Sequence, residues 1–273
     1  MDILTPPQIK ELLKKYDARA QKGLGQNFLI SEGVLSKIIK AAVLKKSDIV
    51  LEVGPGLGIL TKELAKQADK VIAVEKDHNM VRILKETLKD IPNVTIIQDD
   101  ILKISPDKLP VNYKIVANLP YYISAHFIRR FLEEIEHKPS SMTLLLQKEV
   151  AERITASPPR MHLLSVAVQA YAKATIVSSI HPDSFWPAPK VSSSIVHLVP
   201  HQKELPKAFF KVIKAGFLHP RRQLVNNLKE GLDLTREEVE AWLEKCKINP
   251  TQRAERLTVE NWINLSQGYT IKQ

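Results

Sequence analysis

The chain of 273 residues is 44% hydrophobic and 26% charged, which is typical of a globular protein with one large domain or with a main domain and a smaller one. Its 40 lysine and arginine residues exceed its 30 acidic residues, and the net charge of +10 favours a polyanionic partner such as nucleic acid. The single cysteine excludes an internal disulfide framework and a multi-cysteine metal site. Without a long apolar run or a signal-peptide core, the sequence predicts a cytoplasmic protein that holds no metal and does not enter a membrane.

The N-terminal region is predicted to be a helix followed by a basic loop. Pro6 to Tyr16 places apolar side chains on one side of a helix that begins with proline. Lys22 to Leu29 is a loop punctuated by glycine. Ser31 is then expected to cap a helix, because the apolar residues that follow repeat at helical spacing: Val34, Leu35, Ile38, Ile39 and Ala42.

A glycine-rich turn is the first candidate for a ligand site. The apolar run Ile49–Val53 predicts a strand, and it leads into three glycines within 54–58, which let the backbone turn sharply and approach a ligand. A second strand, 71–74, ends in Glu75, 21 residues after Gly54. An acid at about this distance is the expected acceptor for the hydroxyls of a ribose, so we predict a ribose-bearing cofactor.

Two cofactors fit this unit, a dinucleotide and S-adenosylmethionine. A dinucleotide fingerprint places its third glycine where this chain has Ile59. A third strand, 94–97, is followed by Asp100, which could accept a hydrogen bond from an adenine amine or could simply cap a helix. Because ribose and adenine contacts are present without the fingerprint of a pyrophosphate cradle, we favour S-adenosylmethionine.

The segment Asn118-Leu119-Pro120-Tyr121 is the second candidate. Strand 114–117 has to stop before Pro120, which leaves the Asn118 amide and the Tyr121 ring at the carboxyl edge of the sheet, where open α/β sheets bind ligands. An amide beside an aromatic ring suits a flat heterocycle with an exocyclic amine. Taken alone, the four residues are more typical of a simple turn with a core tyrosine.

The remaining pattern predicts two domains. Three further strands complete a set of seven that alternate with helices, so residues 1–199 are predicted to form a Rossmann-like α/β domain with a seven-stranded, mostly parallel sheet and a basic N-terminal arm. Residues 200–273 show helical patterns only and are predicted to form a small, partly basic RNA-binding domain. The added strands are expected at 142–146, 175–179 and 192–199, a proline-stiffened loop at 181–190, and helices at 124–134, from 148, and at 163–171, 206–217, 221–231, 236–246 and 259–267.

Several motifs occur together in one order and carry a family resemblance. From about residue 20 to residue 260 the chain resembles the bacterial small-subunit ribosomal RNA adenine dimethyltransferases, the family whose loss gives kasugamycin resistance. The resemblance implies a class I S-adenosylmethionine-dependent methyltransferase fold with a small C-terminal helical domain. The motifs are Leu-Gly-Gln-Asn-Phe-Leu at 24–29, Glu-Val-Gly-Pro-Gly-Leu-Gly at 52–58, Asn-Leu-Pro-Tyr-Tyr-Ile-Ser at 118–124, Phe-Trp-Pro-Ala-Pro-Lys-Val at 185–191 and Arg221-Arg222.

The resemblance also implies roles for individual residues. Glu75 would hold the ribose hydroxyls of the donor, Asp100 would meet its adenine amine, and Gly54 would approach its methionine part. The complete set for the donor pocket is Asn27, Leu29, Gly54, Gly56, Glu75, Lys76, Asp100, Ile101 and Asn118. Lys22, Lys190, Arg221 and Arg222 are expected to bind RNA.

For the target adenine, the resemblance implies that hydrogen bonds from N6 to the protein activate the nitrogen, so that no strong general base is needed. The Asn118 side-chain oxygen and the carbonyl of Leu119 or Pro120 would accept the two N6 hydrogens, which favours a pyramidal nitrogen whose lone pair points at the methyl group. Tyr121 and Phe185 would stack on the base, each contributing about 1–3 kcal/mol. Catalysis would then be mainly positioning.

The leading hypothesis is a monomeric enzyme that dimethylates N6 of two adjacent adenines near the 3′ end of 16S rRNA on the pre-30S subunit. An antibiotic-resistance methyltransferase acting on 23S rRNA is the alternative within the same chemistry, although Leu119 and the motif at 185–191 favour the small-subunit branch. DNA adenine methylation is disfavoured, because those enzymes typically carry an acid at the position of Asn118. A ribosome assembly factor without essential catalysis is the alternative from a different class.

Overall fold

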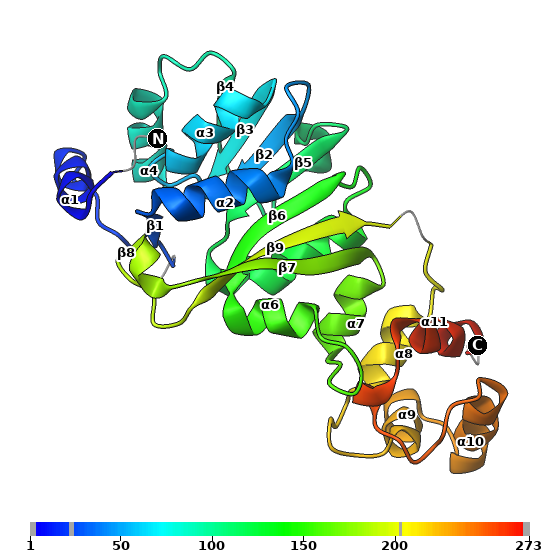
Figure 1. Ribbon diagram of the computed structural model, residues 1–273. Coiled ribbons are helices and arrows are strands. Elements are labelled where there is room, and N and C mark those ends of the chain that lie inside the picture. The colour runs from blue at the N-terminus through cyan, green and yellow to red at the C-terminus, as the bar shows by residue number, and fades with distance from the viewer. Residues whose placement is uncertain (1–3, 22–24, 202–203, 270–273) are drawn as a thin grey trace. The chain divides into compact units, whose positions relative to one another are not determined.

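The computed structural model describes residues 4–21, 25–201 and 204–269, which form two compact units (Figure 1). The first comprises Met1–Ala151 and Thr175–Pro200, and the second comprises Glu152–Ala174 and His201–Gln273. The predicted division into 1–199 and 200–273 therefore needs a correction, since residues 152–174 group with the C-terminal helices. Packing explains the difference, because Met161 belongs to the same buried hydrophobic cluster as those helices.

A seven-stranded sheet forms the centre of the first unit (Figure 1). The strands lie in the order β4-β3-β2-β5-β6-β9-β7, and β9 pairs antiparallel with β6 whereas β2, β3, β4, β5 and β6 are mutually parallel. The predicted fold class, a Rossmann-like and mostly parallel seven-stranded sheet, is confirmed. Its strands are β2 (Ile49–Val53), β3 (Lys70–Glu75), β4 (Val94–Gln98), β5 (Tyr113–Asn118), β6 (Ser141–Gln147), β7 (Ala172–Ile180) and β9 (Ser193–Pro200).

The register of the central strands places the two candidate motifs at one edge. β2 lies between β3 and β5 and is buried on both faces, and Glu52 is the one charged residue among its five. Val53 is paired with Val74, and Glu52 is paired with Val116. The chain therefore leaves β2 at Gly54 and β5 at Asn118 on the same, carboxyl edge of the sheet.

Helices cover both faces of this sheet in the alternating pattern that the sequence predicts (Figure 1). The Ser31 hydroxyl accepts a hydrogen bond from the Val34 amide at 3.4 Å, as expected for an N-cap. The helix predicted over 124–134 continues from an α-helical first half into a π-helical turn, Arg130–Glu134. The helices of this unit are α1 (Pro6–Lys15), α2 (Glu32–Ala42), α3 (Ile59–Gln67), α4 (His78–Thr87) and α5 (Ser124–Arg129), and α6 (Lys148–Ile154) runs across the boundary of the two units.

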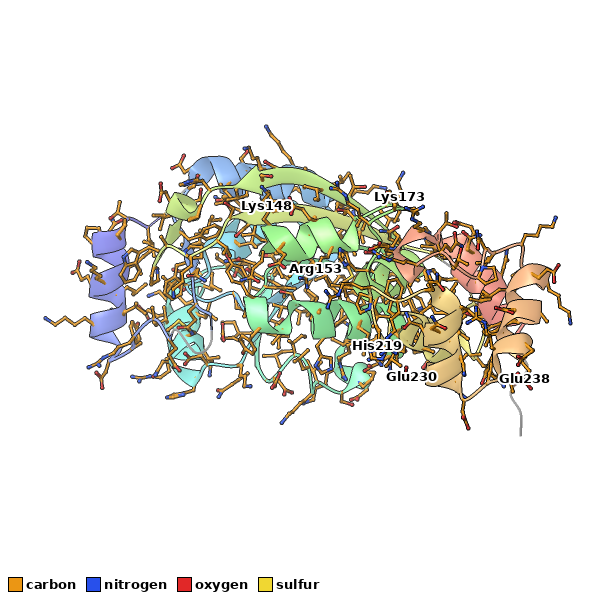
Figure 2. The ribbon with its side chains drawn as sticks, turned by 90° about the horizontal axis from the view of Figure 1, so that it is seen from below. Lys148, Arg153, Lys173, His219, Glu230 and Glu238 are labelled. Atoms are coloured by element: carbon orange, nitrogen blue, oxygen red, sulfur yellow. The ribbon has the colours of Figure 1, made fainter. Side chains whose placement is uncertain are left out.

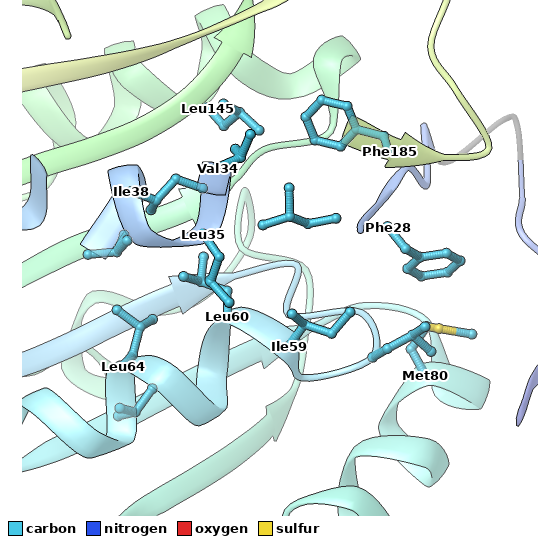
Figure 3. Close-up of a cluster of buried hydrophobic side chains, with 14 of the residues drawn as sticks. Phe28, Val34, Leu35, Ile38, Ile59, Leu60, Leu64, Met80, Leu145 and Phe185 are labelled. Carbon is cyan, nitrogen blue, oxygen red and sulfur yellow. The ribbon is translucent and has the colours of Figure 1, made fainter. Parts of the chain in front are cut away.

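A short ribbon that the sequence does not reveal joins two distant loops. β1 (Phe28–Leu29) pairs antiparallel with β8 (Phe185–Trp186), and Leu29 lies opposite Phe185. Figure 3 shows the rings of Phe28 and Phe185 among the aliphatic side chains of α2 and α3. Strands of two residues carry no periodicity, which explains why only an irregular loop was predicted here.

The second unit is a packed set of helices: α7 (Leu163–Gln169), α8 (Phe209–Gly216), α9 (Leu224–Leu232), α10 (Arg236–Lys245) and α11 (Val259–Gln267). Trp262 is fully buried at its centre. α8 and α9 approach so closely that a Cβ added to Gly231 would lie 2.7 Å from the Ala215 Cα. Among the helices described in either unit, none is long and apolar enough to cross a membrane.

The close approach of α8 and α9 predicts a stability effect. Gly231→Ala should lower the free energy of unfolding of the second unit by about 1–3 kcal/mol, because backbone rather than a flexible side chain blocks the new methyl group. Gly33→Ala in α2 is the control, since its Cβ would meet only the Ser31 hydroxyl at 3.9 Å and should be neutral or stabilising by up to about 1 kcal/mol. Urea unfolding followed by tryptophan fluorescence measures both, and equal stabilities would contradict the packing described.

Candidate functional site

A cavity opens at the carboxyl edge of β2, β3, β4 and β5, in the first unit. It is lined by the loops that follow these strands and by the segment before β1. The structure thus brings together every residue predicted for the donor pocket. These are Asn27, Leu29, Gly54, Gly56, Glu75, Lys76, Asp100, Ile101 and Asn118.

The glycine turn forms one wall of the cavity because its backbone takes a conformation that other residues rarely adopt. Gly54 and Gly56 have φ angles of 64° and 56°, both in the left-handed region. A Cβ on Gly56 would come within 3.3 Å of the Phe28 ring, so a side chain here would press on the β1 ribbon. The glycines therefore let the backbone itself face the cavity.

Glu75, at the end of β3, is held with both carboxylate oxygens oriented. Its Oε2 accepts the Gly56 amide at 3.2 Å, and its Oε1 accepts the Asp77 amide at 2.9 Å. Burial raises the pKa of Glu75, and these backbone donors counteract part of the rise. Each oxygen keeps a further lone pair, so the carboxylate can accept bonds from a pair of vicinal hydroxyls.

Asp100, which follows β4, is fixed beside Lys76. Its Oδ2 accepts Lys76 Nζ at 2.9 Å and its Oδ1 accepts the Leu102 amide at 3.0 Å. Burial would raise the pKa of Asp100, but the Lys76 hydrogen bond and the amide outweigh burial and lower it. The side chain is therefore an ionised acceptor, which suits an exocyclic amine.

Asn118, at the end of β5, is oriented by the segment before β1. Its Nδ2 donates to the Asn27 carbonyl at 3.1 Å. A carbonyl can only accept, so the amide orientation is settled and the Asn118 Oδ1 is left as an acceptor for a ligand. The neighbouring Tyr121 is fixed in turn, because its hydroxyl lies 2.7 Å from the Ser193 hydroxyl of β9.

Phe185 is buried in the hydrophobic cluster of the first unit, whereas a ring that stacks on a target base has to face the cavity. Its side chain is only 2% exposed and belongs to the hydrophobic cluster of the first unit (Figure 3). Among the described residues that line the cavity, Phe185 is absent, although Leu29, its partner across the ribbon, is present. A role in stacking on a base stays a prediction.

Three of the four residues expected to bind RNA are among the described residues, and all three are exposed. Lys22 lies outside the described residues, and Lys190 is exposed after β8. Arg221 and Arg222 are exposed before α9. Arg222 Nη1 donates to Glu230 Oε2 at 2.7 Å, and the other Glu230 oxygen is 3.0 Å from His219 Nε2 (Figure 2).

Glu52 is a site residue to which the sequence interpretation gave no role. It lines the cavity from within β2 and is 1% exposed, and its Oε2 has no hydrogen-bond partner among the described residues. Burial raises the pKa of Glu52 to about 8, with a further contribution from the charge of Glu75, while Thr61 offsets only part of the rise. An acid inside the apolar run Ile49–Val53 was the signal that would have identified it.

The sheet topology and this cavity define a class I S-adenosylmethionine-dependent methyltransferase. The family model for ribosomal RNA adenine dimethylase matches residues 17–270, and the chain belongs to that family. The Ribosomal RNA small subunit methyltransferase A of Dehalococcoides mccartyi is 46% identical, with 96% of this chain and 93% of the relative covered.

Two solved structures resemble the chain over most of its length. A dimethyladenosine transferase from Plasmodium falciparum superposes with a TM-score of 0.75 at 27% identity and covers 87% of this chain and 95% of its own. The 23S rRNA methyltransferase ErmE superposes with a TM-score of 0.72 at 26% identity, covering 89% of this chain and 99% of its own.

The side chains present fit S-adenosylmethionine. The donor carries positive charge at its sulfur, and a buried carboxyl with an unpartnered oxygen is the counterpart that a cation requires. Glu75 and Asp100 would offer acceptors for its ribose and its adenine, and Glu52, which lines the same cavity, would be the acid that meets its charge.

The raised pKa of Glu52 predicts that donor affinity depends on pH. A cation favours the ionised carboxylate, so affinity for S-adenosylmethionine should increase as pH rises toward about 8 and level off above it. Glu52→Gln should weaken binding by about 10- to 100-fold at pH 9 and by much less at pH 6, where the native carboxyl is already neutral. Glu75 leaves a residual pH dependence because its pKa is also raised.

The Glu52 carboxyl should also make the stability of the donor-free protein depend on pH, and this stability should fall with rising pH where donor affinity rises. Because the folded protein binds the Glu52 proton more tightly than the unfolded chain does, stability falls as pH rises from the unfolded pKa to about 8. Isothermal titration and thermal unfolding across pH 6–9 measure the two effects. Glu63→Gln is the control, because Glu63 is a buried acid of α3 that is not among the described residues lining the cavity. This variant should keep the wild-type dependence of donor affinity and of stability on pH. Identical pH profiles for Glu52→Gln and Glu63→Gln would contradict the role of Glu52.

Proposed function

We propose that this protein transfers methyl groups from S-adenosylmethionine to N6 of two adjacent adenines near the 3′ end of 16S rRNA, dimethylating each during assembly of the small ribosomal subunit in the cytoplasm. The observation that carries the proposal is the orientation of Asn118. Its amide nitrogen donates to the Asn27 carbonyl, so its oxygen is left as an acceptor on a residue that lines the cavity together with the acids suited to the donor. An acceptor in that place matches an exocyclic amine.

Positioning of N6 is the central step of the mechanism. When bound, S-adenosylmethionine supplies an electrophilic methyl group. The Asn118 Oδ1 accepts one N6 hydrogen and a main-chain carbonyl accepts the other, and the two bonds together draw the nitrogen lone pair out of conjugation with the ring. The geometry favours Leu119 for the second acceptor, because the Pro120 carbonyl already accepts the Ile123 amide at 3.2 Å and the Ser124 hydroxyl at 3.4 Å.

Tyr121 is the aromatic ring best placed to hold the base. It lines the cavity, and its hydroxyl is anchored on Ser193, so little side-chain entropy is lost when a base stacks on it. A stack of this kind contributes about 1–3 kcal/mol and helps to offset the cost of removing the adenine from its own stack. Phe185 would complete the enclosure only if the β1–β8 ribbon moved its ring toward the cavity, since the ring is buried in the cluster.

Removal of the proton needs no strong base on the protein. The nitrogen becomes acidic once it carries the new methyl group, and water can accept its proton. After the first transfer, N6 carries one methyl group and one hydrogen. A single acceptor can hold this N–H during the second transfer, while the methyl group takes the place of the other hydrogen. The protein therefore contributes mainly binding and orientation.

The choice of the small-subunit RNA rests on sequence similarity. The relative named for the small subunit is 46% identical, whereas the 23S rRNA methyltransferase of known structure is 26% identical. Incubation with labelled S-adenosylmethionine and undermodified 30S particles, followed by mapping of dimethyladenosine, tests the proposal. Methylation of 23S rRNA alone would select the antibiotic-resistance alternative, and binding without any transfer would select an assembly factor.

Asn118→Ala tests the mechanism. We expect kcat to fall by about 100-fold or more, because N6 loses the bond that orients it, while donor affinity falls by no more than about tenfold. Asn264→Ala removes an exposed amide of the second unit and is the control for the substitution itself. Single-turnover rates with saturating donor measure the effect, and wild-type rates for Asn118→Ala would rule out the assigned role.

The arginine pair predicts unequal contributions to RNA binding. Glu230 already neutralises Arg222, whereas Arg221 has no acidic partner among the described ion pairs. Arg221→Gln should therefore weaken RNA binding more than Arg222→Gln and should reduce the slope of log K against log salt by about 1. Filter binding at several salt concentrations measures both, and equal losses would show that the Glu230 pair opens on RNA.

A further inference from the structure

Asp77 is a buried acid for which the mechanism above has no use. It follows β3, is 5% exposed, and is absent from the described residues that line the cavity. Its Oδ2 accepts two side-chain amides, Gln21 Nε2 at 3.0 Å and Gln26 Nε2 at 2.9 Å. Its Oδ1 accepts the Asn79 amide at 2.9 Å and so caps α4. The carboxylate thus holds two residues that precede it by more than 50 positions.

These bonds are part of a continuous path that connects Glu75 with Asn118, two residues that line the cavity. The Asp77 amide donates to Glu75 Oε1, on the donor side. Gln26, bound to the Asp77 carboxylate, also accepts the Gln21 amide at 2.8 Å through its Oε1, so its side chain is fixed at both ends. The next residue, Asn27, accepts the Asn118 Nδ2 at 3.1 Å through its carbonyl.

We propose that Asp77 is a positioning residue for methyl transfer: through Gln26 it fixes the Asn27 carbonyl, and thereby the Asn118 amide that accepts N6–H. The inference rests on the proposed function for its activity readout. Asn27 lies between two fixed neighbours, Phe28 in the β1–β8 ribbon and Gln26 on the Asp77 carboxylate, and its own Nδ2 is turned back to the Gly25 carbonyl at 3.1 Å. The Gln26 anchor therefore fixes the Asn27 carbonyl from the side that the ribbon does not hold. Two donors on one carboxylate oxygen make that anchor charge-assisted.

A purely structural role as the α4 cap is the competing explanation, and it makes different predictions. Asp77→Asn keeps an oxygen for the Asn79 amide and so keeps the cap, but it places an NH₂ group against the Gln26 NH₂ group. Gln26→Glu combined with Asp77→Asn reverses the polarity of the bond between these two positions and restores it, and the carboxylate introduced at position 26 still accepts the Gln21 amide. The exposed Gln21 side chain, which also donates to Asp77, can turn its own oxygen toward the new NH₂ group. Lys85→Gly weakens α4 at an exposed position away from the path and is the matched control.

The experiment measures single-turnover methyl transfer, donor affinity and thermal stability for the wild type and these variants. We expect Asp77→Asn to lower the transfer rate by about tenfold or more, with donor affinity within about threefold of the wild type, because the Glu75 bond is made by the main chain. The double variant should recover to within about threefold. If Asp77→Asn transfers methyl groups at the wild-type rate, Asp77 acts only as a cap. If Lys85→Gly lowers the rate as much at equal stability loss, or if the double variant fails to recover, the positioning path through Gln26 is ruled out.

A second readout does not depend on activity. In protein with ¹⁵N-labelled asparagine, the side-chain NH₂ signals of Asn118 are identified by their loss in Asn118→Ala. Their hydrogen exchange should be slow in the wild type, faster in Asp77→Asn and slow again in the double variant. An unchanged exchange rate in Asp77→Asn would overturn the proposal. Absence of methyl transfer by the wild type would instead refute the proposed function, and this readout would still decide the role of Asp77.

Discussion

The parallel pairing of β2 with both β3 and β5 is the constraint on which the site depends. Because Val53 lies opposite Val74 and Glu52 opposite Val116, three strands deliver their carboxyl ends to one edge within a residue or two of each other. Strand pairing alone therefore brings together groups that are distant in the sequence. These groups are Glu75 at the end of β3, the glycine turn after β2 and Asn118 at the end of β5. A slip of one residue in this register would turn every side chain of β2 to the opposite face and remove Glu52 from the cavity that it lines, so strand pairing fixes the site geometry.

Buried acids give the cavity its chemical character and reduce the stability of the empty protein. Glu75 is compensated by backbone amides on both oxygens, whereas Glu52 keeps an oxygen without a partner among the described residues. An uncompensated carboxyl in a low-dielectric wall is unfavourable until a cation arrives, and a cationic donor therefore binds more favourably than a neutral molecule of the same shape.

The sequence was sufficient for those features that leave a local pattern. Apolar runs located the strands, and Gly54 with Glu75 at the expected spacing located one wall of the cavity, because turn geometry and strand length constrain that spacing. The β1–β8 ribbon, the grouping of residues 152–174 with the C-terminal helices and the buried position of Phe185 were not predictable, since each depends on contacts between distant segments. The bonds from Asp77 to Gln21 and Gln26 are of the same kind: three polar residues in two loops look like solvated side chains until the fold brings them together.

Selection of one RNA cannot come from the cavity alone. The cavity presents acceptors for a single base, and adenine N6 is the same in every RNA, so the surroundings of the target have to be read by groups outside it. The exposed Lys190 and Arg221 can contact phosphates without reading sequence, which orients an RNA but does not distinguish sequences. Arg222 differs because Glu230 holds its guanidinium in one direction and limits its use as a freely adapting charge.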